Sequence, residues 1–344
     1  MGLTLGLLLF SFIVTSICII PFINVLYTLR FQRKNVKTQD MFGKRASIFD
    51  TLHKHKVGTP IGGGLLIILV VSMLFVSIFQ VLKLLGISVT NVYPLQKELN
   101  VIFFTFLSFG VLGLYDDIKK FFGFEKTGFF GLRLWQKLLL QCGLAAIISS
   151  MLYYSLGISI VNVPFFGVVH LGWTFLLFSS FTIVSFANAV NITDGLDGLA
   201  AGVLLICLFG LWVISATILD TTITIFLALW IGALIAFLYF NIFPARIMMG
   251  DVGALAFGAT LAVVGLLLGK IIALIIIGGI FVVEITSSLL QLVSKRLRNG
   301  KKLFPVAPVH LWMQYRGWQE PKIVQRAMLT GIVLALFGLW LTVI

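Results

Sequence analysis

Apolar residues recur along the chain in runs of about 20, separated by short polar segments. A run of this length crosses a membrane as a helix, so the pattern predicts an all-α polytopic membrane protein with about ten transmembrane helices. We expect one integral membrane domain over residues 1–344, and a short β-hairpin in the alternating segment 158–171. The predicted spans are residues 3–28, 60–82, 99–115, 137–157, 171–190, 198–219, 222–241, 253–268, 270–293 and 326–343.

Composition agrees with this pattern. Hydrophobic residues make up 60% of the chain and charged residues only 11%, against about 25% charged in an ordinary soluble domain. This excludes a soluble globular protein, a disordered chain and a nucleic-acid-binding module, despite a net charge of +13. The first apolar run lacks a basic start and a small-residue cleavage site, so we expect a retained helix. Three cysteines inside apolar runs form neither a disulfide framework nor a zinc site.

Loop charge predicts the orientation. An even number of spans places both termini on the same side of the membrane. Most of the 25 Lys and Arg residues fall in the loops after the odd-numbered spans; the exceptions are Lys83, Lys97 and Lys270. The positive-inside rule therefore puts those loops in the cytoplasm and both termini outside. The same basic face would attract anionic lipid or phosphates.

Aspartates gather at the predicted cytoplasmic ends of three spans. Asp116 and Asp117 follow the third span, Asp194 and Asp197 the fifth, and Asp251 the seventh. Placing a carboxylate near the hydrocarbon of the membrane costs free energy, so such a group usually faces a polar cavity or binds a cation. Three separate segments are therefore expected to deliver carboxylates to one depth of the membrane.

Three motifs surround these aspartates. The adjacent Asp116 and Asp117 repel each other, which suits a divalent metal bridging to phosphate and a neighbouring base, although such a pair can also simply solvate a helix end. The segment 188–200 holds two amides and two carboxylates beside glycines that allow close ligand approach, and we favour a functional site there. Asp251 lies between Gly250 and Gly253. The pattern predicts either a metal ligand or the N-cap of the following helix.

Two further motifs are basic or aromatic. The segment 52–64 combines His53, His55 and Lys56 with a Gly-rich helix start that favours anions; a zinc pair or plain positive-inside charge are the alternatives. The last cytoplasmic loop contains His310, followed by aromatic residues typical of the headgroup region, including Trp312. We expect His310 to act near phosphate.

Together these five motifs, in this order, resemble one family. It is the phospho-N-acetylmuramoyl-pentapeptide transferases, within the polyprenyl-phosphate N-acetylhexosamine-1-phosphate transferases. The resemblance implies transfer of phospho-MurNAc-pentapeptide from UDP-MurNAc-pentapeptide to undecaprenyl phosphate, giving lipid I and UMP for peptidoglycan synthesis. It further implies Mg²⁺, the bacterial inner (plasma) membrane and its lipid, and it leaves a homodimer open.

The resemblance also implies roles for individual residues. Asp251 would bind the metal, and Asp116 or Asp117 would act as base toward the lipid phosphate. His310 completes the implied catalytic set. The residues implied to contact the phosphates, the metal or the uracil are Lys56, Lys120, Lys137, Asn188, Asn191, Asp194, Gly195, Leu196, Asp197, Met248 and Gln291. Met248 stands where the family usually has phenylalanine.

Two other functions are weighed. A sister enzyme would transfer another UDP-N-acetylhexosamine-1-phosphate, such as GlcNAc-1-phosphate, to a polyprenyl phosphate. An ion-coupled transporter would place its key charges near the membrane midplane, where Glu284 is the one candidate in the sequence.

Overall fold

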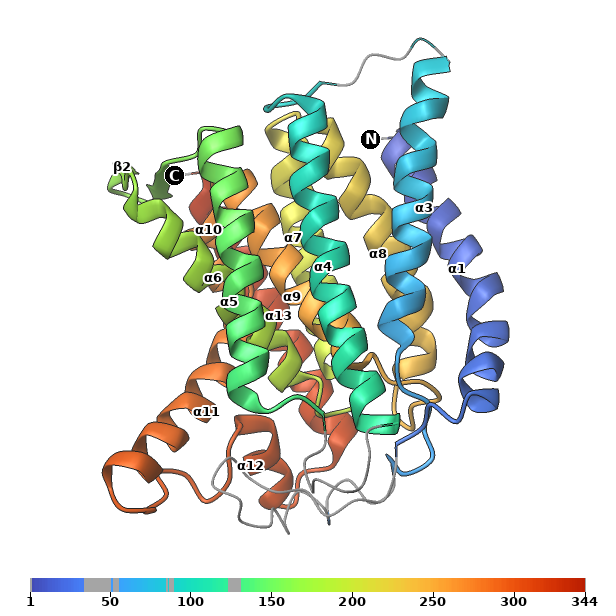
Figure 1. The fold of residues 1–344 in the computed structure, drawn as a ribbon, viewed down its shortest axis with the longest axis vertical. Coiled ribbons are helices and arrows are strands. Elements are labelled where there is room, and N and C mark those ends of the chain that lie inside the picture. Colours follow the sequence, from blue (N-terminus) through green and yellow to red (C-terminus); the bar gives the residue numbers. More distant parts are fainter. Residues whose placement is uncertain are drawn as a thin grey trace.

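The computed structural model describes residues 2–33, 51, 56–84, 86, 90–122 and 131–343. The described chain is a bundle of long helices, shown in Figure 1, which confirms the predicted all-α membrane architecture. The helices are α1 (Gly2–Thr28), α3 (Gly63–Leu84), α4 (Leu95–Phe122), α5 (Leu134–Ser150) with the π-helical turn Met151–Ser155, α6 (Thr174–Thr193), α7 (Leu199–Thr217), α8 (Thr221–Asn241), α9 (Gly250–Leu267), α10 (Ile271–Ile277), α11 (Gly279–Leu297), α12 (Val309–Tyr315) and α13 (Glu320–Val343).

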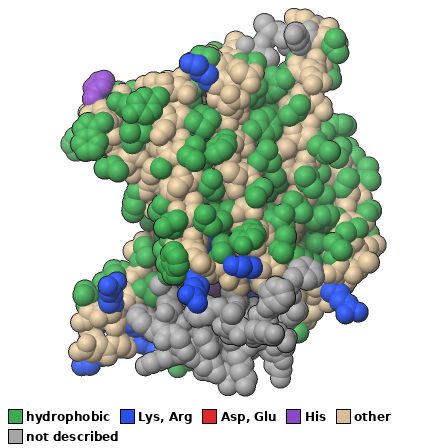
Figure 2. Space-filling view, in the orientation of Figure 1, with side chains coloured by type: hydrophobic (Ala, Val, Ile, Leu, Met, Phe, Trp, Pro, Cys, Tyr) green, Lys and Arg blue, Asp and Glu red, His purple; other side chains and the backbone are tan. Residues whose placement is uncertain are grey.

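The number of spans agrees with the prediction. Within the described ranges, nine helices are long and apolar enough to cross a membrane, and the bent pair α10–α11 brings the total to as many as ten. Hydrophobic side chains cover the middle of the face in Figure 2, while Lys and Arg lie toward its ends. This distribution is the one expected for helices surrounded by lipid.

Two helix ends differ from the prediction. α4 continues to Phe122, beyond the predicted end at 115, so Asp116 and Asp117 lie on its last turns and not in a loop. α13 begins at Glu320, ahead of the predicted start at 326. In both cases the helix extends past the apolar run, and the carboxylates on the added turns are buried against partners: Asp116 pairs with Lys120, and Glu320 pairs with Lys56.

The ninth predicted span is not one straight helix. α10 and α11 meet at Gly278 with a bend of 79°, and α11 leaves the bundle in Figure 1. Glycine is a common position for a sharp kink. At the adjacent Gly279, a Cβ atom would lie 2.9 Å from Leu334 of α13, so close packing also requires a small residue there. Hydropathy alone detects the apolar length but not this bend.

The predicted hairpin is present. β1 (Ile160–Val163) pairs antiparallel with β2 (Gly167–His170). Both ends of the described chain lie at the hairpin's end of the bundle, opposite α12 (Figure 1). The expectation that both termini share one side is therefore confirmed, whereas the assignment of that side to the outside stays a prediction.

Close helix packing brings the aspartates together. α9 is buried along almost its whole length and packs against α4, α6 and α3. A Cβ on Gly113 of α4 would collide with the backbone of Asp251, and a Cβ on Gly64 of α3 would collide with Gly253. Small residues let membrane helices approach backbone to backbone. The start of α9 therefore lies directly beside the last turns of α4.

Candidate active site

Asp251, at the start of α9, is the centre of a polar cluster at the α12 end of the bundle. Its Oδ2 lies 2.7 Å from Nζ of Lys120 on α4 and also pairs with Nζ of Lys137 on α5. Nδ2 of Asn191, from the last turn of α6, donates to its Oδ1 at 3.0 Å. Side chains from three other helices thus converge on this carboxylate of α9.

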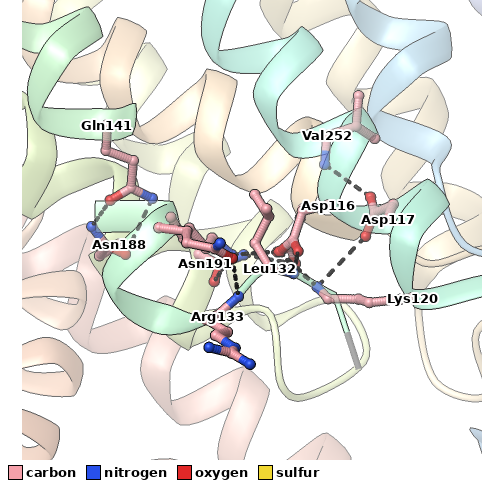
Figure 3. Close-up of polar contacts among 12 residues, drawn as sticks. Asp116, Asp117, Lys120, Leu132, Arg133, Gln141, Asn188, Asn191 and Val252 are labelled. Atoms are coloured by element: carbon pink, nitrogen blue, oxygen red, sulfur yellow. Dashed lines mark hydrogen bonds and ion pairs between the residues drawn. The ribbon is translucent and has the colours of Figure 1, made fainter. Parts of the chain in front are cut away.

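Asp116 joins the same cluster, as Figure 3 shows. Its Oδ2 lies 3.1 Å from Nζ of Lys137 and 3.3 Å from Nζ of Lys120. Its Oδ1 accepts a hydrogen bond of 2.7 Å from the backbone N–H of Leu132. Gly131, which directly precedes Leu132, has φ +80°. A Cβ atom built on Gly131 would lie 2.6 Å from Oδ1 of Asp116. Glycine at this turn therefore lets the backbone reach the carboxylate.

Asp117 is also held in a fixed position. It is buried, and its Oδ2 accepts a 3.0 Å hydrogen bond from the backbone N–H of Val252 at the start of α9. Its Oδ1 lies 3.8 Å from Nζ of Lys120. Gly250 has φ +79°, and a Cβ there would lie 2.8 Å from Asp117 Oδ2. The glycine before Asp251 thus allows the start of α9 to approach α4.

The cluster combines three carboxylates with two ammonium groups. Its donors toward a cation are oxygen atoms, the ligand type that Mg²⁺ prefers. Among the residues that the structure describes, no three His, Cys, Asp or Glu side chains form a closed metal cage. Mg²⁺ is usually held by only one or two carboxylates, together with water and substrate phosphates. The residues therefore fit a magnesium ion that is completed by a phosphate ligand.

Asp194 follows α6 and lies close to the cluster. Burial, with the negative charges of Asp251 and Asp117, raises the pKa of Asp194 to about 8. The positive charge of Lys56 and a hydrogen bond from the backbone of Gly250 act in the opposite direction. Asn188, which the sequence also predicts to belong to the site, lies earlier on α6. Its Nδ2 donates a 2.6 Å hydrogen bond to Oε1 of Gln141 on α5.

A second polar cluster lies beside the first and holds the loop after α6. Nζ of Lys56 lies 2.8 Å from Oδ1 of Asp197 and 2.5 Å from Oε1 of Glu320, and it donates to the carbonyl of Gly195 at 3.0 Å. The other carboxylate oxygen of Asp197 accepts from the backbone N–H of Ala245 at 2.9 Å. Lys56 therefore links the segment between α1 and α3 to the loop 194–198 and to α13.

His310, at the start of α12, contacts this loop from the other side. Its Nδ1 lies 3.0 Å from Oε2 of Glu284 on α11, and its backbone N–H donates to Oε1 of the same residue at 3.1 Å. Its Nε2 faces Gly195, because a Cβ on that glycine would overlap this atom. The bend at Gly278 thus brings Glu284 to the site and not to the centre of a transmembrane helix.

Three predicted residues lie apart from the carboxylate cluster. Leu196 and Met248 are buried, and the backbone of Met248 pairs with Pro60 and with the start of α3. Oε1 of Gln291 accepts from the backbone N–H groups of Leu303 and Phe304, each at 2.9 Å, so this side chain fixes the loop after α11. A direct substrate contact by any of the three stays a prediction. His53 and His55 lie outside the described residues, so the zinc alternative stays open there.

Two charged residues of the site were not singled out from the sequence. Glu320 binds Lys56 and also accepts a 2.5 Å hydrogen bond from the backbone N–H of Asp197. Arg33 lies near enough to Asp194, Asp197 and Glu320 to interact with their charges, and burial lowers its pKa. The sequence feature that could have pointed to Glu320 is that it is the single acidic residue in the strongly basic segment 295–326.

Comparison with known proteins shows which family the chain resembles. The family model Glycosyl transferase family 4 matches residues 99–269, the segment that contains Asp116 and Asp251. Three similar proteins carry the name phospho-N-acetylmuramoyl-pentapeptide-transferase. The protein of Limosilactobacillus fermentum is 37% identical over 82% of this chain and 83% of its own length, and that of Limosilactobacillus reuteri is 38% identical over 84% of each chain. The protein of Rickettsia montanensis is 37% identical over 83% of this chain and 80% of its own.

Proposed function

Because the chain belongs to the phospho-N-acetylmuramoyl-pentapeptide transferase family, we propose that it transfers phospho-MurNAc-pentapeptide from UDP-MurNAc-pentapeptide to undecaprenyl phosphate. The products are lipid I and UMP, and the reaction takes place at the cytoplasmic face of the bacterial plasma membrane. The observation that carries the proposal is the cluster of Asp116, Asp117 and Asp251 with Lys120 and Lys137 at one end of the helix bundle. A soluble nucleotide and a membrane-bound phosphate can meet only at such an interface.

The reaction is a phosphoryl transfer. An oxygen of the acceptor phosphate attacks the phosphorus that bears the sugar, the bond to the bridging pyrophosphate oxygen breaks, and UMP leaves with that electron pair. Asp116 or Asp117 takes the proton of the acceptor phosphate, because both carboxylates are fixed by backbone N–H groups and face the lysines. Phosphoryl transfer is mostly positioning and charge neutralisation, which a rigid set of charges supplies.

Basic residues balance the charge of the phosphates. Lys120 and Lys137 each contact two or more carboxylates in this structure, and a substrate phosphate would compete for them. Asp251 would hold Mg²⁺ together with substrate oxygens, and the bound ion would neutralise the pyrophosphate. His310 is oriented by Glu284 and lies against the loop 194–198, where it would contact the second phosphate or the uridine.

The experiment is a transfer assay with purified protein in detergent. UDP-MurNAc-pentapeptide and UDP-GlcNAc are each supplied with undecaprenyl phosphate and Mg²⁺, and mass spectrometry identifies the lipid product. We expect phospho-MurNAc-pentapeptide on the lipid, equimolar UMP, and exchange of labelled UMP into UDP-MurNAc-pentapeptide. Transfer of GlcNAc-1-phosphate alone would instead support the sister activity, and no transfer by stable protein would refute both.

A further inference from the structure

Two amide side chains, Gln141 of α5 and Asn188 of α6, form a reciprocal pair between their helices. Nδ2 of Asn188 donates to Oε1 of Gln141 at 2.6 Å, and Nε2 of Gln141 donates to Oδ1 of Asn188 at 3.4 Å. Figure 3 shows the two amides facing each other. Gln141 is completely buried. The pair therefore fixes how α5 and α6 lie against each other, as interhelical hydrogen bonds do in membrane proteins.

The amide of Asn188 is fully used inside the protein. Besides its bond to Gln141, Nδ2 donates to the carbonyl of Val184 at 2.8 Å. An amide group has two N–H donors, so both are engaged, and Oδ1 accepts from Gln141. This arrangement leaves no N–H of Asn188 for a substrate, and it suits a residue that holds α6 in place.

The amide pair lies one helical turn from the charged cluster. Lys137 precedes Gln141 by four positions on α5, and Asn191 follows Asn188 by three on α6. Residues three or four positions apart share one face of a helix. Lys137 and Asn191 both contact Asp251, and Nζ of Lys137 lies 3.5 Å from Oδ1 of Asn191. The pair thus sits directly behind two side chains that converge on one carboxylate.

The start of α5 depends on this pair because its other side chains face outward. Leu134, Trp135 and Leu139 are exposed on the turns around Lys137. Lipid tails are as apolar as these side chains, so contact with lipid gives α5 no preferred register against α6. The polar contacts along α6 are what set the position from which Lys137 reaches the cluster.

A second polar contact joins the same two helices away from the cluster. Oγ of Ser180 on α6 donates to Oγ of Ser149 on α5 at 2.9 Å. Each serine is eight positions from the amide on its own helix, which is about 12 Å at the helical rise of about 1.5 Å per residue. This contact offers a matched control, since it belongs to the same helix interface but not to the site.

We propose that Gln141 is a positioning residue of the active site. Its paired hydrogen bonds with Asn188 hold α5 against α6 so that Lys137 and Asn191 reach Asp251 together. This inference rests on the proposed function. Neither amide contacts the substrates, and both act through the lysine and the asparagine one turn nearer the cluster.

The first test measures kcat and KM for UDP-MurNAc-pentapeptide in Gln141→Leu, Asn188→Leu and the double variant. A misplacement of about 1 Å in an active site can cost about 10²-fold in rate, and we expect each single variant to lower kcat by about tenfold. KM should change by less than about twofold, because no substrate contact is lost. The double variant should lose about tenfold and not about 100-fold, since both changes remove the same contact. Ser149→Ala should keep the kcat of the wild type.

The second test exchanges the two amides. Gln141→Asn shortens the pair by one methylene and Asn188→Gln lengthens it by one, so the double variant restores the combined length. We expect each single change to lower kcat and the exchanged pair to recover to within about threefold of the wild type. Because the exchange keeps both amides, it also tests the proposal if the leucine variants do not fold.

Four results would overturn the proposal. They are a wild-type kcat in Gln141→Leu, multiplicative losses in the double leucine variant, a KM increase confined to Asn188→Leu, and an equal loss of kcat in Ser149→Ala. Failure of the exchanged pair to recover would also overturn it. Absence of transfer by the wild type would instead refute the proposed function. Thermal denaturation tests the pairing independently of transfer, and the exchanged pair should then be more stable than either single exchange variant.

Discussion

Replacing Gly195 with alanine should damage the site through His310. A Cβ at position 195 would lie 3.1 Å from Cε1 and 3.4 Å from Cδ2 of the imidazole, and it would overlap Nε2. Ordinary contact between such atoms begins at about 3.5 Å, so the ring must withdraw by roughly 1 Å. It cannot rotate freely, because Glu284 holds both its Nδ1 and its backbone N–H.

The expected size follows from this displacement. A misplacement of about 1 Å in an active site can cost about 10²-fold in rate. We therefore expect Gly195→Ala to lower kcat by about 10²-fold, measured as UMP released per minute with UDP-MurNAc-pentapeptide and undecaprenyl phosphate. Gly6→Ala in α1 is the matched control, since the same methyl group meets no atom there.

A double variant tests the reasoning. If the methyl group acts by displacing His310, adding Gly195→Ala to His310→Ala should change neither residual activity nor thermal stability, because the clashing ring is gone. Full activity of Gly195→Ala would refute the argument. An equal further loss in the His310→Ala background would also refute it, since the damage would then come from the loop itself.

Three further predictions concern charged residues. Asp251→Asn should abolish transfer while the protein still folds, because it removes the proposed metal ligand; full activity of that variant in excess EDTA would contradict this. Glu320→Gln should lower the free energy of unfolding by about 3 kcal/mol, since Lys56 loses a buried partner; an unchanged thermal denaturation would count against it. Burial raises the pKa of Asp220, which lies near Glu98 at the opposite end of the bundle. That end is therefore most stable while Asp220 is protonated and loses stability as pH rises through the raised pKa. Asp220→Asn should flatten the dependence of thermal stability on pH, because it removes the titrating carboxyl, and an unaltered profile would be evidence against this argument.

The sequence predicts the number and approximate position of the helices because apolar runs of membrane length carry that information directly. It also predicts which polar segments matter, since carboxylates are rare in this chain and gather beside the spans. Asp116, Asp117 and Asp251 are in fact brought together, through glycine-mediated contact of α4 with α9.

Other features do not follow from local pattern. The bend at Gly278 depends on how α10 and α11 pack against α13 and leaves the hydropathy of the ninth span unchanged. The ion pair of Lys56 with Glu320 joins residues 264 positions apart. The spacing of apolar and polar residues along the chain does not indicate such a distant partner. The burial of Met248 results from pairing of its backbone with Pro60.

The central claim is that the carboxylate cluster carries out the transfer, and the aspartate pair tests it most directly. Asp116→Asn and Asp117→Asn keep the size of each side chain and remove its charge. In the transfer assay with undecaprenyl phosphate, each should lower kcat by about 10²-fold or more, the scale of a lost general base, while thermal stability in detergent stays within the range of the wild type. Normal turnover by both variants would contradict the account.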